Sequence, residues 1–251
     1  MAVTKKPAAK PNKRTRRKTA AKVPLWRRIW RWRLVRWLRW GVLAAVMVVL
    51  LFVSAFGIVN PPTTPYIVSE ARRLGSVQRQ WIALDRMSPD LARAVVAAED
   101  ANFCLHWGFD MAAIRAAIDE GAERGASTLS QQVTKNVFLW QRRSWPRKAL
   151  EAGLTPLVEA IWSKERIVEV YLNVAEFGEG IFGVQAAARH YFGVSASEVT
   201  AAQAALLAAV LPAPKTRSAS KPSDFVRRRA GSIRDGAATI RADGRSDCFE
   251  S

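Results

Sequence analysis

Two segments of this 251-residue chain combine residue types suited to acid–base chemistry on an anionic substrate. In the first, AAEDANFCLHWGFD (97–110), Glu99 and Asp100 follow the apolar residues of a predicted helix and precede an aromatic turn. The negative end of a helix dipole and apolar neighbours both disfavour ionisation of a carboxyl group and raise its pKa. Glu99 could therefore act as an acid or a base near neutral pH. A solvated helix end with a structural Asp cap explains the same residues about equally well.

The second segment, GASTLSQQVTKNVFLW (125–140), predicts a capped helix with polar walls. Its polar side chains are Ser127, Thr128, Gln131, Gln132, Lys135 and Asn136. Gln131 and Lys135 are four residues apart, so they share one helix face. Such a face offers several hydrogen-bond donors to an anionic or hydroxyl-rich ligand. An ordinary polar surface helix is the alternative.

Basic residues concentrate directly after this helix, in RRSWPRKALE (142–151). They are Arg142, Arg143, Arg147 and Lys148. Glu151 follows Arg147 by four residues and Lys148 by three, so helical spacing places its carboxylate beside both cations. A surface ion pair explains Glu151 alone, whereas four cations in seven residues are better suited to phosphate.

The elements that must position these residues are almost all helices, and the sequence predicts an all-α fold. Ser88-Pro89-Asp90 indicates a helix start, with a capping hydroxyl and proline at the first helical position, and apolar spacing carries that helix to about Ala101. Further helices are predicted near 110–121, 128–139, 147–161, 164–173, 183–192 and 197–210. No segment shows the alternation typical of a strand.

The net charge of +18 belongs mainly to the N-terminal arm. Residues 1–40 contain 15 Lys and Arg and no acidic residue, and the rest of the chain is nearly balanced. Residues 1–24 are expected to be disordered. In LWRRIWRWRLVRWLRW (25–40), Trp and Arg alternate as in a membrane-interface collar. A nucleic-acid-binding helix is the alternative, but the segment adjoins the strongest apolar run of the chain.

That run, GVLAAVMVVLLFVSAFGIV (41–59), has 19 uncharged residues and spans roughly 28 Å as a helix, close to the hydrocarbon thickness of a bilayer. A cleaved signal peptide usually has a shorter apolar region, which favours an uncleaved transmembrane helix. The positive-inside rule then places residues 1–40 in the cytoplasm and the remaining chain outside it.

Few residues are available for metal binding or cross-linking. The chain has only two histidines and two cysteines, so we do not expect a zinc site of ordinary composition, and no metal site is predicted. A disulfide between Cys104 and Cys248 is permitted outside the cytoplasm, and two separate thiols are as compatible with the sequence.

Taken in order, these segments resemble the peptidoglycan glycosyltransferase family, and within it the stand-alone, monofunctional transglycosylases. The resemblance runs from about Arg86 to Pro214. It rests on EDANFCLHWG (99–108), GASTLSQQVTKN (125–136), RKALE (147–151), KERIVEVYLN (164–173) and AALLAAVLPAPK (204–215). It implies a mainly helical, lysozyme-like fold with a larger head lobe and a smaller membrane-proximal lobe.

The resemblance also implies the reaction and its residues. The family makes β-1,4 glycan strands from lipid II by inverting transfer, with release of undecaprenyl diphosphate. Glu99 corresponds to the general base and Glu151 to the second functional carboxylate. Lys135, Arg143, Arg147 and Lys148 correspond to phosphate-binding positions. Cleft positions are Asp100, Phe103, His106, Ser127, Thr128, Gln131, Gln132 and Asn136.

Further expectations concern the chain as a whole. They are a cytoplasmic arm (1–40), a transmembrane helix (41–59), a connector (60–85), a glycosyltransferase domain (86–225) and a basic polar tail (226–251). We expect a single-pass inner-membrane protein with a periplasmic domain, without transpeptidase or nucleic-acid-binding activity. No cofactor is required, although a divalent Mg or Mn at the pyrophosphate fits the family. The growing strand, the membrane and cell-wall synthesis or division proteins are the expected partners.

Two alternatives remain at this stage. A lysozyme-like lytic enzyme would also use a catalytic glutamate, but it would not need a cationic diphosphate site. A membrane-tethered nucleic-acid-binding or scaffold protein would rest on the basic arm alone. Val137, Phe138, Leu139, Trp140 and Trp145 lie beside the cationic segment, and we hypothesise that part of this stretch enters the lipid interface.

Overall fold

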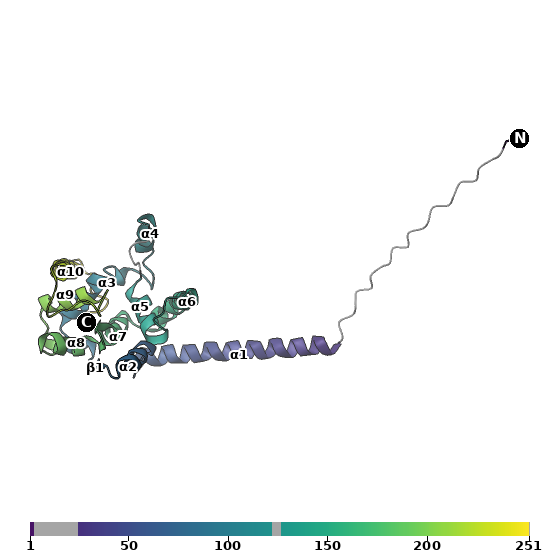
Figure 1. The fold of residues 1–251 in the computed structure, drawn as a ribbon, viewed down its shortest axis with the longest axis horizontal. Coiled ribbons are helices and arrows are strands. Elements are labelled where there is room, and N and C mark those ends of the chain that lie inside the picture. Colours follow the sequence, from purple (N-terminus) through teal and green to yellow (C-terminus); the bar gives the residue numbers. More distant parts are fainter. Residues whose placement is uncertain (3–24, 122–126, 251) are drawn as a thin grey trace. The chain divides into compact units, whose positions relative to one another are not determined.

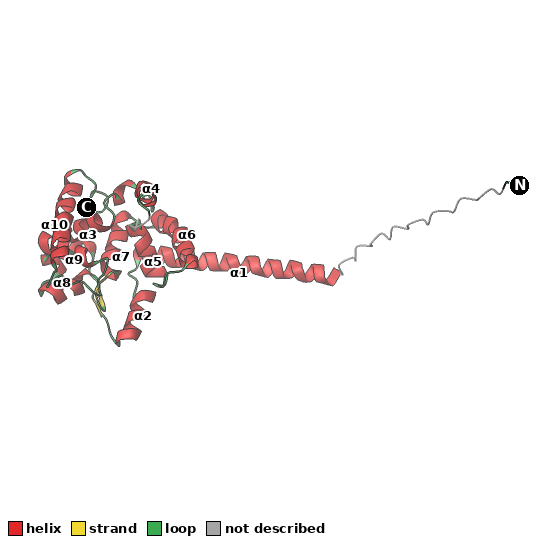
Figure 2. Ribbon diagram, turned by 45° about the horizontal axis from the view of Figure 1, so that its top comes forward, coloured by secondary structure: helices red, strands yellow, loops and turns green. Residues whose placement is uncertain are grey.

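The computed structural model describes residues 1–2, 25–121 and 127–250, so the disorder expected for most of 1–24 lies outside the described residues. Within them, helices predominate and the three strands are very short (Figures 1 and 2). The helices are α1 (Leu25–Ile58), α2 (Pro65–Leu74), α3 (Pro89–Glu99), α4 (Met111–Asp119), α5 (Leu129–Phe138), α6 (Trp145–Ile161), α7 (Lys164–Val174), α8 (Val184–Phe192), α9 (Ala201–Val210) and α10 (Asp224–Ala242). The strands are β1 (Gln78–Arg79), β2 (Glu176–Gly178) and β3 (Ile181–Phe182).

The chain divides into two compact units, Met1–Val49 and Leu50–Ser251. Helix α1 supplies most of the described first unit and contributes its last turns to the second. Residues Trp32–Ile58 are long and apolar enough to cross a membrane. The Trp/Arg collar is therefore continuous with the predicted span rather than a separate helix. Leu43 and Met47 have exposed side chains, as a helix surrounded by lipid requires.

The predicted helices of the second unit are confirmed, most of them within two or three residues of the expected ends. Helix α3 begins at Pro89 as expected, but the Ser88 side chain makes no capping hydrogen bond. Helix α5 begins with a full capping box. The Thr128 hydroxyl accepts from the Gln131 backbone N–H, while the Gln131 side chain accepts from the Thr128 N–H.

Three features differ from the expectation. The segment expected to be a connector contains α2, which starts at the Thr64 cap and Pro65. Most of the residues expected to form a polar tail belong to α10, because Val226, Ala230, Ile233 and Ile240 are buried along one helix face. The strands escape detection because they are two or three residues long. β3 pairs with β1 in parallel and with β2 in antiparallel orientation.

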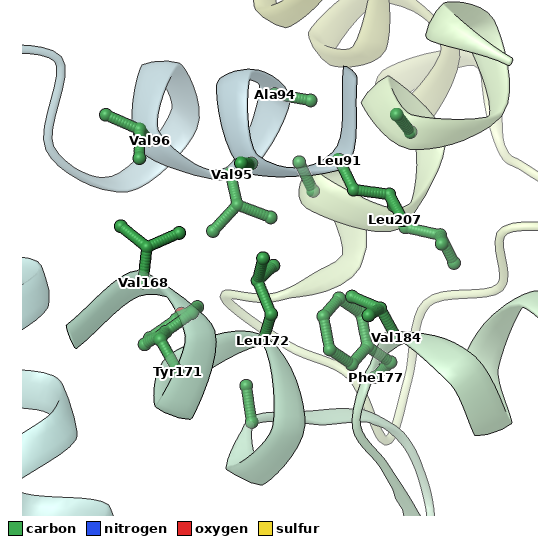
Figure 3. Close-up of a cluster of buried hydrophobic side chains, with 14 of the residues drawn as sticks. Leu91, Ala94, Val95, Val96, Val168, Tyr171, Leu172, Phe177, Val184 and Leu207 are labelled. Atoms are coloured by element: carbon green, nitrogen blue, oxygen red, sulfur yellow. The ribbon is translucent and has the colours of Figure 1, made fainter. Parts of the chain in front are cut away.

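The core of the second unit forms where α7 meets α3. In Figure 3, Leu172 of α7 lies between Val95 of α3 and Phe177, and all three side chains are fully buried. Helices α9 and α10 pack against α3 and against each other, while α5 packs against α6 and α7 (Figures 1 and 2). Helix α7 thus contacts both groups of helices, and the end of α3 is held where the two groups meet.

A disulfide joins Cys104 to Cys248, across 144 residues of sequence. The pairing left open by the sequence is therefore present. Neighbouring contacts support it: Phe249 packs against Phe103 with ring centroids 6.4 Å apart, and Arg93 binds Glu250 at 2.6 Å. The C-terminal residues consequently fasten the short turn that follows Glu99.

We expect loss of this disulfide to destabilise the second unit by about 2–5 kcal/mol, because the bond closes a long loop. The measurement is urea unfolding of the purified protein with and without reductant. A Cys104→Ala/Cys248→Ala variant serves as the control, since it should unfold at the same urea concentration whether or not reductant is present. An unfolding midpoint that reductant leaves unchanged in the wild type would contradict the expectation.

Candidate active site

Glu99 is the last residue of α3, and its carboxylate faces α5. The Gln132 side chain donates from Nε2 to Glu99 Oε2 at 2.9 Å. Tyr171 of α7 donates its hydroxyl to Gln132 Oε1 at 3.2 Å, and Tyr171 is buried. Because the amide oxygen is occupied by Tyr171, the amide nitrogen is directed at Glu99. Three helices together therefore fix the orientation of one carboxylate.

Burial raises the pKa of Glu99 above its usual value, and the nearby charge of Asp100 acts in the same direction. The Gln132 hydrogen bond and the positive charges of Arg229 and Lys135 oppose this rise in pKa. Glu99 still retains some solvent exposure. The arrangement yields an accessible carboxyl group with an enhanced affinity for a proton, as a general base requires.

Asp100 connects the end of α3 to the start of α5. Its Oδ2 accepts from the Leu129 backbone N–H at 2.9 Å, which is one of the unpaired donors at a helix N-terminus. Its Oδ1 lies 2.9 Å from Nε2 of His106, whose ring packs edge-on against Phe103. Asp100, Phe103 and His106 are thus turned into the protein, where they support Glu99.

The turn after Glu99 is also held from the side of α7. Lys164 Nζ donates to the His106 carbonyl at 2.8 Å and lies 4.2 Å from the centroid of the Phe103 ring. Lys164 also pairs with the buried Glu159 at 2.9 Å, and Ser130 donates to the same Glu159 oxygen. A buried polar network therefore links α5, α6 and α7 beneath the turn.

Gly108 ends this turn in the left-handed region, at φ 81°. A Cβ atom there would lie 3.0 Å from Cγ2 of Thr155 and 3.2 Å from Cγ of Glu159. The Gly108 carbonyl accepts a hydrogen bond from the Thr128 hydroxyl at 2.7 Å. Both the backbone angle and the close approach therefore require glycine at this position.

A pocket of about 520 Å³ lies beside Glu99 and between α5 and α6. It is lined by Ser127, Gln131, Gln132, Lys135, Arg143, Ser144, Trp145, Arg147, Lys148 and Glu151. Gln132 reaches both this pocket and Glu99, so the pocket and the carboxylate belong to one site. Among the described residues, four cations and one carboxylate line the pocket, which suits a multiply charged anion such as a diphosphate.

Glu151 is buried and already paired. Arg147 donates to it at 2.7 Å and Lys148 at 2.5 Å, as the i+4 and i+3 spacing predicts. Lys148 also donates to the Ser127 hydroxyl at 3.4 Å. Removing one partner of such a buried pair is costly because the other charge is left unpaired. Glu151 therefore holds the two cations at the pocket wall.

The side chain of Lys135 makes no hydrogen bond or ion pair with any residue that the structure describes. Burial lowers the pKa of its ammonium group, as do the charges of Arg147 and Lys148, while Glu151 and Glu99 act in the opposite direction. Lys135 thus lies within electrostatic range of both carboxylates. Its donors remain available to a ligand in the pocket.

The predicted site residues fall into two groups. Ser127, Gln131, Gln132, Lys135, Arg143, Arg147, Lys148 and Glu151 line the pocket. Asp100, Phe103, His106, Thr128 and Asn136 instead lie in the surrounding framework and do not line it. Asn136 is buried and accepts from Gln141 at 2.9 Å, so it stabilises the loop after α5.

The sequence reasoning missed Ser144, which lines the pocket, and two residues that act on Glu99 or its partner. Tyr171 was counted only as part of a helix, since nothing in its local spacing indicates that its hydroxyl reaches Gln132. Arg229 lies on α10, in the segment expected to be a tail, yet its charge acts on Glu99. Its position among three consecutive arginines (227–229) was the only available signal.

The described residues were considered as ligands for a metal ion. Among the described residues, no group of three or more His, Cys, Asp or Glu side chains could hold a metal ion. The pocket contains one carboxylate, Glu151, and two cations already bind it. The residues present therefore do not fit a divalent cation held by protein ligands.

Comparison with known proteins places these features in a family. Residues 67–237 match the family model described as Transglycosylase, from α2 into α10. A biosynthetic peptidoglycan transglycosylase of Jannaschia sp. (strain CCS1) is 60% identical over 214 residues, covering 85% of this chain and 90% of that protein.

Relatives of the same description occur in other bacteria. That of Pseudomonas fluorescens (strain SBW25) is 50% identical over 218 residues, which cover 82% of this chain and 88% of that protein. That of Rhodospirillum centenum (strain ATCC 51521 / SW) is 48% identical over 210 residues, covering 82% and 90%.

We expect the carboxyl group of Glu99 to titrate above 4.5, and replacement of Gln132 by Leu to raise its pKa further. The substitution removes a donor that stabilises the charged form. Because the folded-state pKa is raised, the stability tied to this group is present at low pH and is lost as pH rises through that pKa. Carbon-13 NMR of labelled glutamate, with Glu99→Gln for assignment, measures it; a pKa at or below 4.5 would contradict the expectation.

Proposed function

The chain belongs to the transglycosylase family, and from that premise we propose that it polymerises peptidoglycan glycan strands from lipid II. It is a glycosyltransferase of peptidoglycan biosynthesis, and its substrate is a lipid-linked glycan. The observation that carries the assignment to this site is the placement of Glu99 beside a pocket walled by four cations. Lipid II is the substrate we assign, because it joins a sugar to a diphosphate.

The reaction follows from this placement. Glu99 removes the proton from the 4-hydroxyl of the acceptor sugar, and that oxygen attacks the anomeric carbon of the donor. The bond between the anomeric carbon and the diphosphate breaks on the opposite side, so configuration inverts and a β-1,4 linkage results. A positioned base contributes about 10²–10⁴-fold to such a step.

The departing undecaprenyl diphosphate carries the negative charge that the pocket accommodates. Lys135, Arg143 and Lys148 are the cations we assign to it, because Lys135 has no ion-pair partner among the described residues and the other two are wholly or partly exposed. Removing one such donor typically costs about 10²–10³-fold in rate. Glu151 and Arg147 serve this site by positioning Lys148 rather than by transferring protons.

No cofactor is needed for this scheme. The protein's own cations neutralise the diphosphate, and a divalent Mg or Mn ion held by the substrate's phosphates would add to them without requiring protein ligands. A lytic activity is not favoured, because the relatives are described as biosynthetic and hydrolysis of finished glycan has no use for a cationic diphosphate pocket. We propose strand polymerisation as the activity, since the family model that matches the chain is described as Transglycosylase.

One helix among the described residues is long and apolar enough to cross a membrane, and we propose that it anchors the chain with the catalytic unit in the periplasm. The 15 basic residues before the apolar run favour a cytoplasmic N-terminus in the inner membrane. The disulfide between Cys104 and Cys248 supports the same orientation, because such bonds persist in oxidising compartments.

The surface we assign to the lipid interface agrees only in part with the one expected. Val137 and Leu139 are buried, and Phe138 packs against Phe56 with ring centroids 6.0 Å apart, so these three belong to the core. Trp140 and Trp145 are exposed, and so are Leu150 and Ile161, which helical spacing places on another side of α6 from Trp145. Trp145 lines the cationic pocket, and an exposed aromatic side chain there suits a substrate held in a bilayer.

The proposed function is tested by incubating the purified protein with fluorescent lipid II in detergent. Glu99→Gln should lower the initial rate of strand formation by about 10²–10⁴-fold, because the base is lost while the fold remains. Glu165→Gln, the same substitution outside the site, is the matched control. The products are separated on a gel, where strands of increasing length form a ladder. Equal rates for Glu99→Gln and wild type would refute the mechanism. Shortening of finished glycan would favour the lytic alternative.

The lipid-facing residues are tested with residues 50–251, which lack most of the membrane-spanning part of α1 but keep its last turns. Trp145→Ser/Leu150→Ser should weaken binding to phosphatidylglycerol vesicles by at least about tenfold, since burying even one large apolar side chain is worth about 1.5–3 kcal/mol. Phe225→Ser, a similarly exposed aromatic on α10, is the control. Co-sedimentation measures binding, and unchanged affinity would exclude this surface.

A further inference from the structure

The last turns of the membrane helix are built into the catalytic unit. Residues Leu50–Ile58 of α1 belong to the same compact unit as the active site. Val53 is fully buried, although it lies in the most apolar helix of the chain. Trp162, at the end of α6, donates its indole N–H to the Val53 carbonyl at 2.7 Å. Gly57 allows the indole to lie close, since a Cβ there would be 3.1 Å from Trp162 Cδ1.

Arg166 closes the C-terminal end of α1. Its guanidinium donates to the Phe56 carbonyl at 3.0 and 3.2 Å and to the Val59 carbonyl at 2.9 Å. It also donates to the Asn60 side chain at 2.9 Å and pairs with Glu169 at 3.2 Å. The last carbonyls of a helix have no partner within the helix, and a planar guanidinium can satisfy several of them at once.

Arg79 holds the residues that follow. It donates to the Pro61 carbonyl at 2.7 Å and to the Pro62 carbonyl at 2.6 Å. The Trp81 ring lies 5.7 Å from the Arg79 guanidinium and 5.5 Å from that of Arg166. Trp81, Trp162 and the two arginines thus form one cluster, which we call the helix clamp.

The helix clamp acts at a place where unpaired carbonyls are costly. In the hydrocarbon region of a bilayer no water is available to pair an unsatisfied carbonyl, so the end of a membrane helix needs donors from the protein. Cationic donors also complement the negative end of the helix dipole. Arg166 is nearly buried, so its contacts are protected from competition with water. The clamp is therefore rigid compared with a solvated linker.

Helices α5 and α7 supply Gln132 and Tyr171, the side chains that orient Glu99. The end of α5 contacts the helix clamp, and the first turn of α7 contains Arg166 of the clamp. Arg166 lies on α7 five residues before Tyr171, about 7.5 Å along the helix axis. Phe138 ends α5, six residues after Gln132, and stacks between Phe56 of α1 and Trp162, at ring distances of 6.0 and 6.1 Å. Tyr171 and Gln132 are the two side chains that direct Glu99.

We propose that Arg166, with Trp162 and Arg79, is a positioning residue that fixes the catalytic site to the end of the membrane helix, so that Glu99 meets substrate tethered in the same bilayer. The proposal rests on the proposed function, because only a lipid-linked substrate makes the site's orientation to the membrane matter. Geometric misplacement of about 1 Å can lower a rate about 10²-fold. A loosened clamp should therefore impair reaction in bilayers while sparing it in detergent.

The experiment compares the full-length protein in two settings, with lipid II incorporated either into phosphatidylglycerol vesicles or into detergent micelles. Arg166→Gln should lower the rate in vesicles at least about tenfold and the rate in micelles less than about twofold, given the sensitivity of catalysis to orientation. Trp162→Phe, which removes the indole N–H and replaces the indole with a smaller aromatic ring, should act in the same direction with a smaller effect. Arg227→Gln, an exposed arginine paired within α10, is the control.

A second measurement reports on the clamp without activity. Spin labels at Leu51→Cys and Ser197→Cys lie on exposed positions of α1 and of the rest of the catalytic unit. Arg166→Gln should broaden their distance distribution, and Arg227→Gln should leave it unchanged. Equal loss of rate in vesicles and micelles, or an unbroadened distribution with folded protein, would overturn the proposal. Absence of strand formation by the wild type would refute the proposed function, while the spin-label result would still decide whether the clamp is rigid.

Discussion

The hydrogen bond from the Leu129 backbone N–H to the Asp100 carboxylate is the contact on which the site depends. It joins the last turn of α3 to the first turn of α5, two segments 29 residues apart in the sequence. Once these helix ends meet, Glu99 lies within reach of Gln132. The same carboxylate binds His106, so the turn after Glu99 folds back against the protein. A charged acceptor at a helix N-terminus suits both the unpaired N–H groups and the dipole.

Opposing electrostatic effects share this small volume. Burial raises the pKa of Glu99, whereas the Gln132 donor and the charges of Arg229 and Lys135 lower it. On the other side of Lys135, Glu151 neutralises part of the charge of Arg147 and Lys148 and so allows these cations to lie close together. Glu99, whose pKa is raised, is suited to accept a proton, whereas Glu151, which is paired with Arg147 and Lys148, is suited to hold those cations. Two residues of the same type thus have different roles because their surroundings differ.

Contacts from several segments hold the turn after Glu99 in place. Lys164 binds its backbone from α7, Thr128 binds it from α5, and the disulfide fastens it to the C-terminal segment. The last turns of the membrane helix are joined to the ends of α5 and α7 in the same unit. Orientation of the reacting groups is thus achieved by contacts among distant segments, which is how folded proteins lower the entropic cost of a reaction between two large substrates.

The sequence alone determined most of the helices, the apolar helix long enough to span a membrane, the position of Glu99 at a helix end and the pairing of Glu151 with Arg147 and Lys148. Each of these depends on local spacing or on an uninterrupted apolar run. It did not reveal α10, whose buried face becomes recognisable only once α3 and α9 cover it, nor the short strands. Tertiary structure alone decided that Tyr171 aims Gln132 at Glu99, that Arg229 acts on the same carboxylate, and that Cys104 meets Cys248. It also assigned Phe138 to the core and left Trp145 exposed, since burial depends on which segments pack together and local apolarity does not specify that partner.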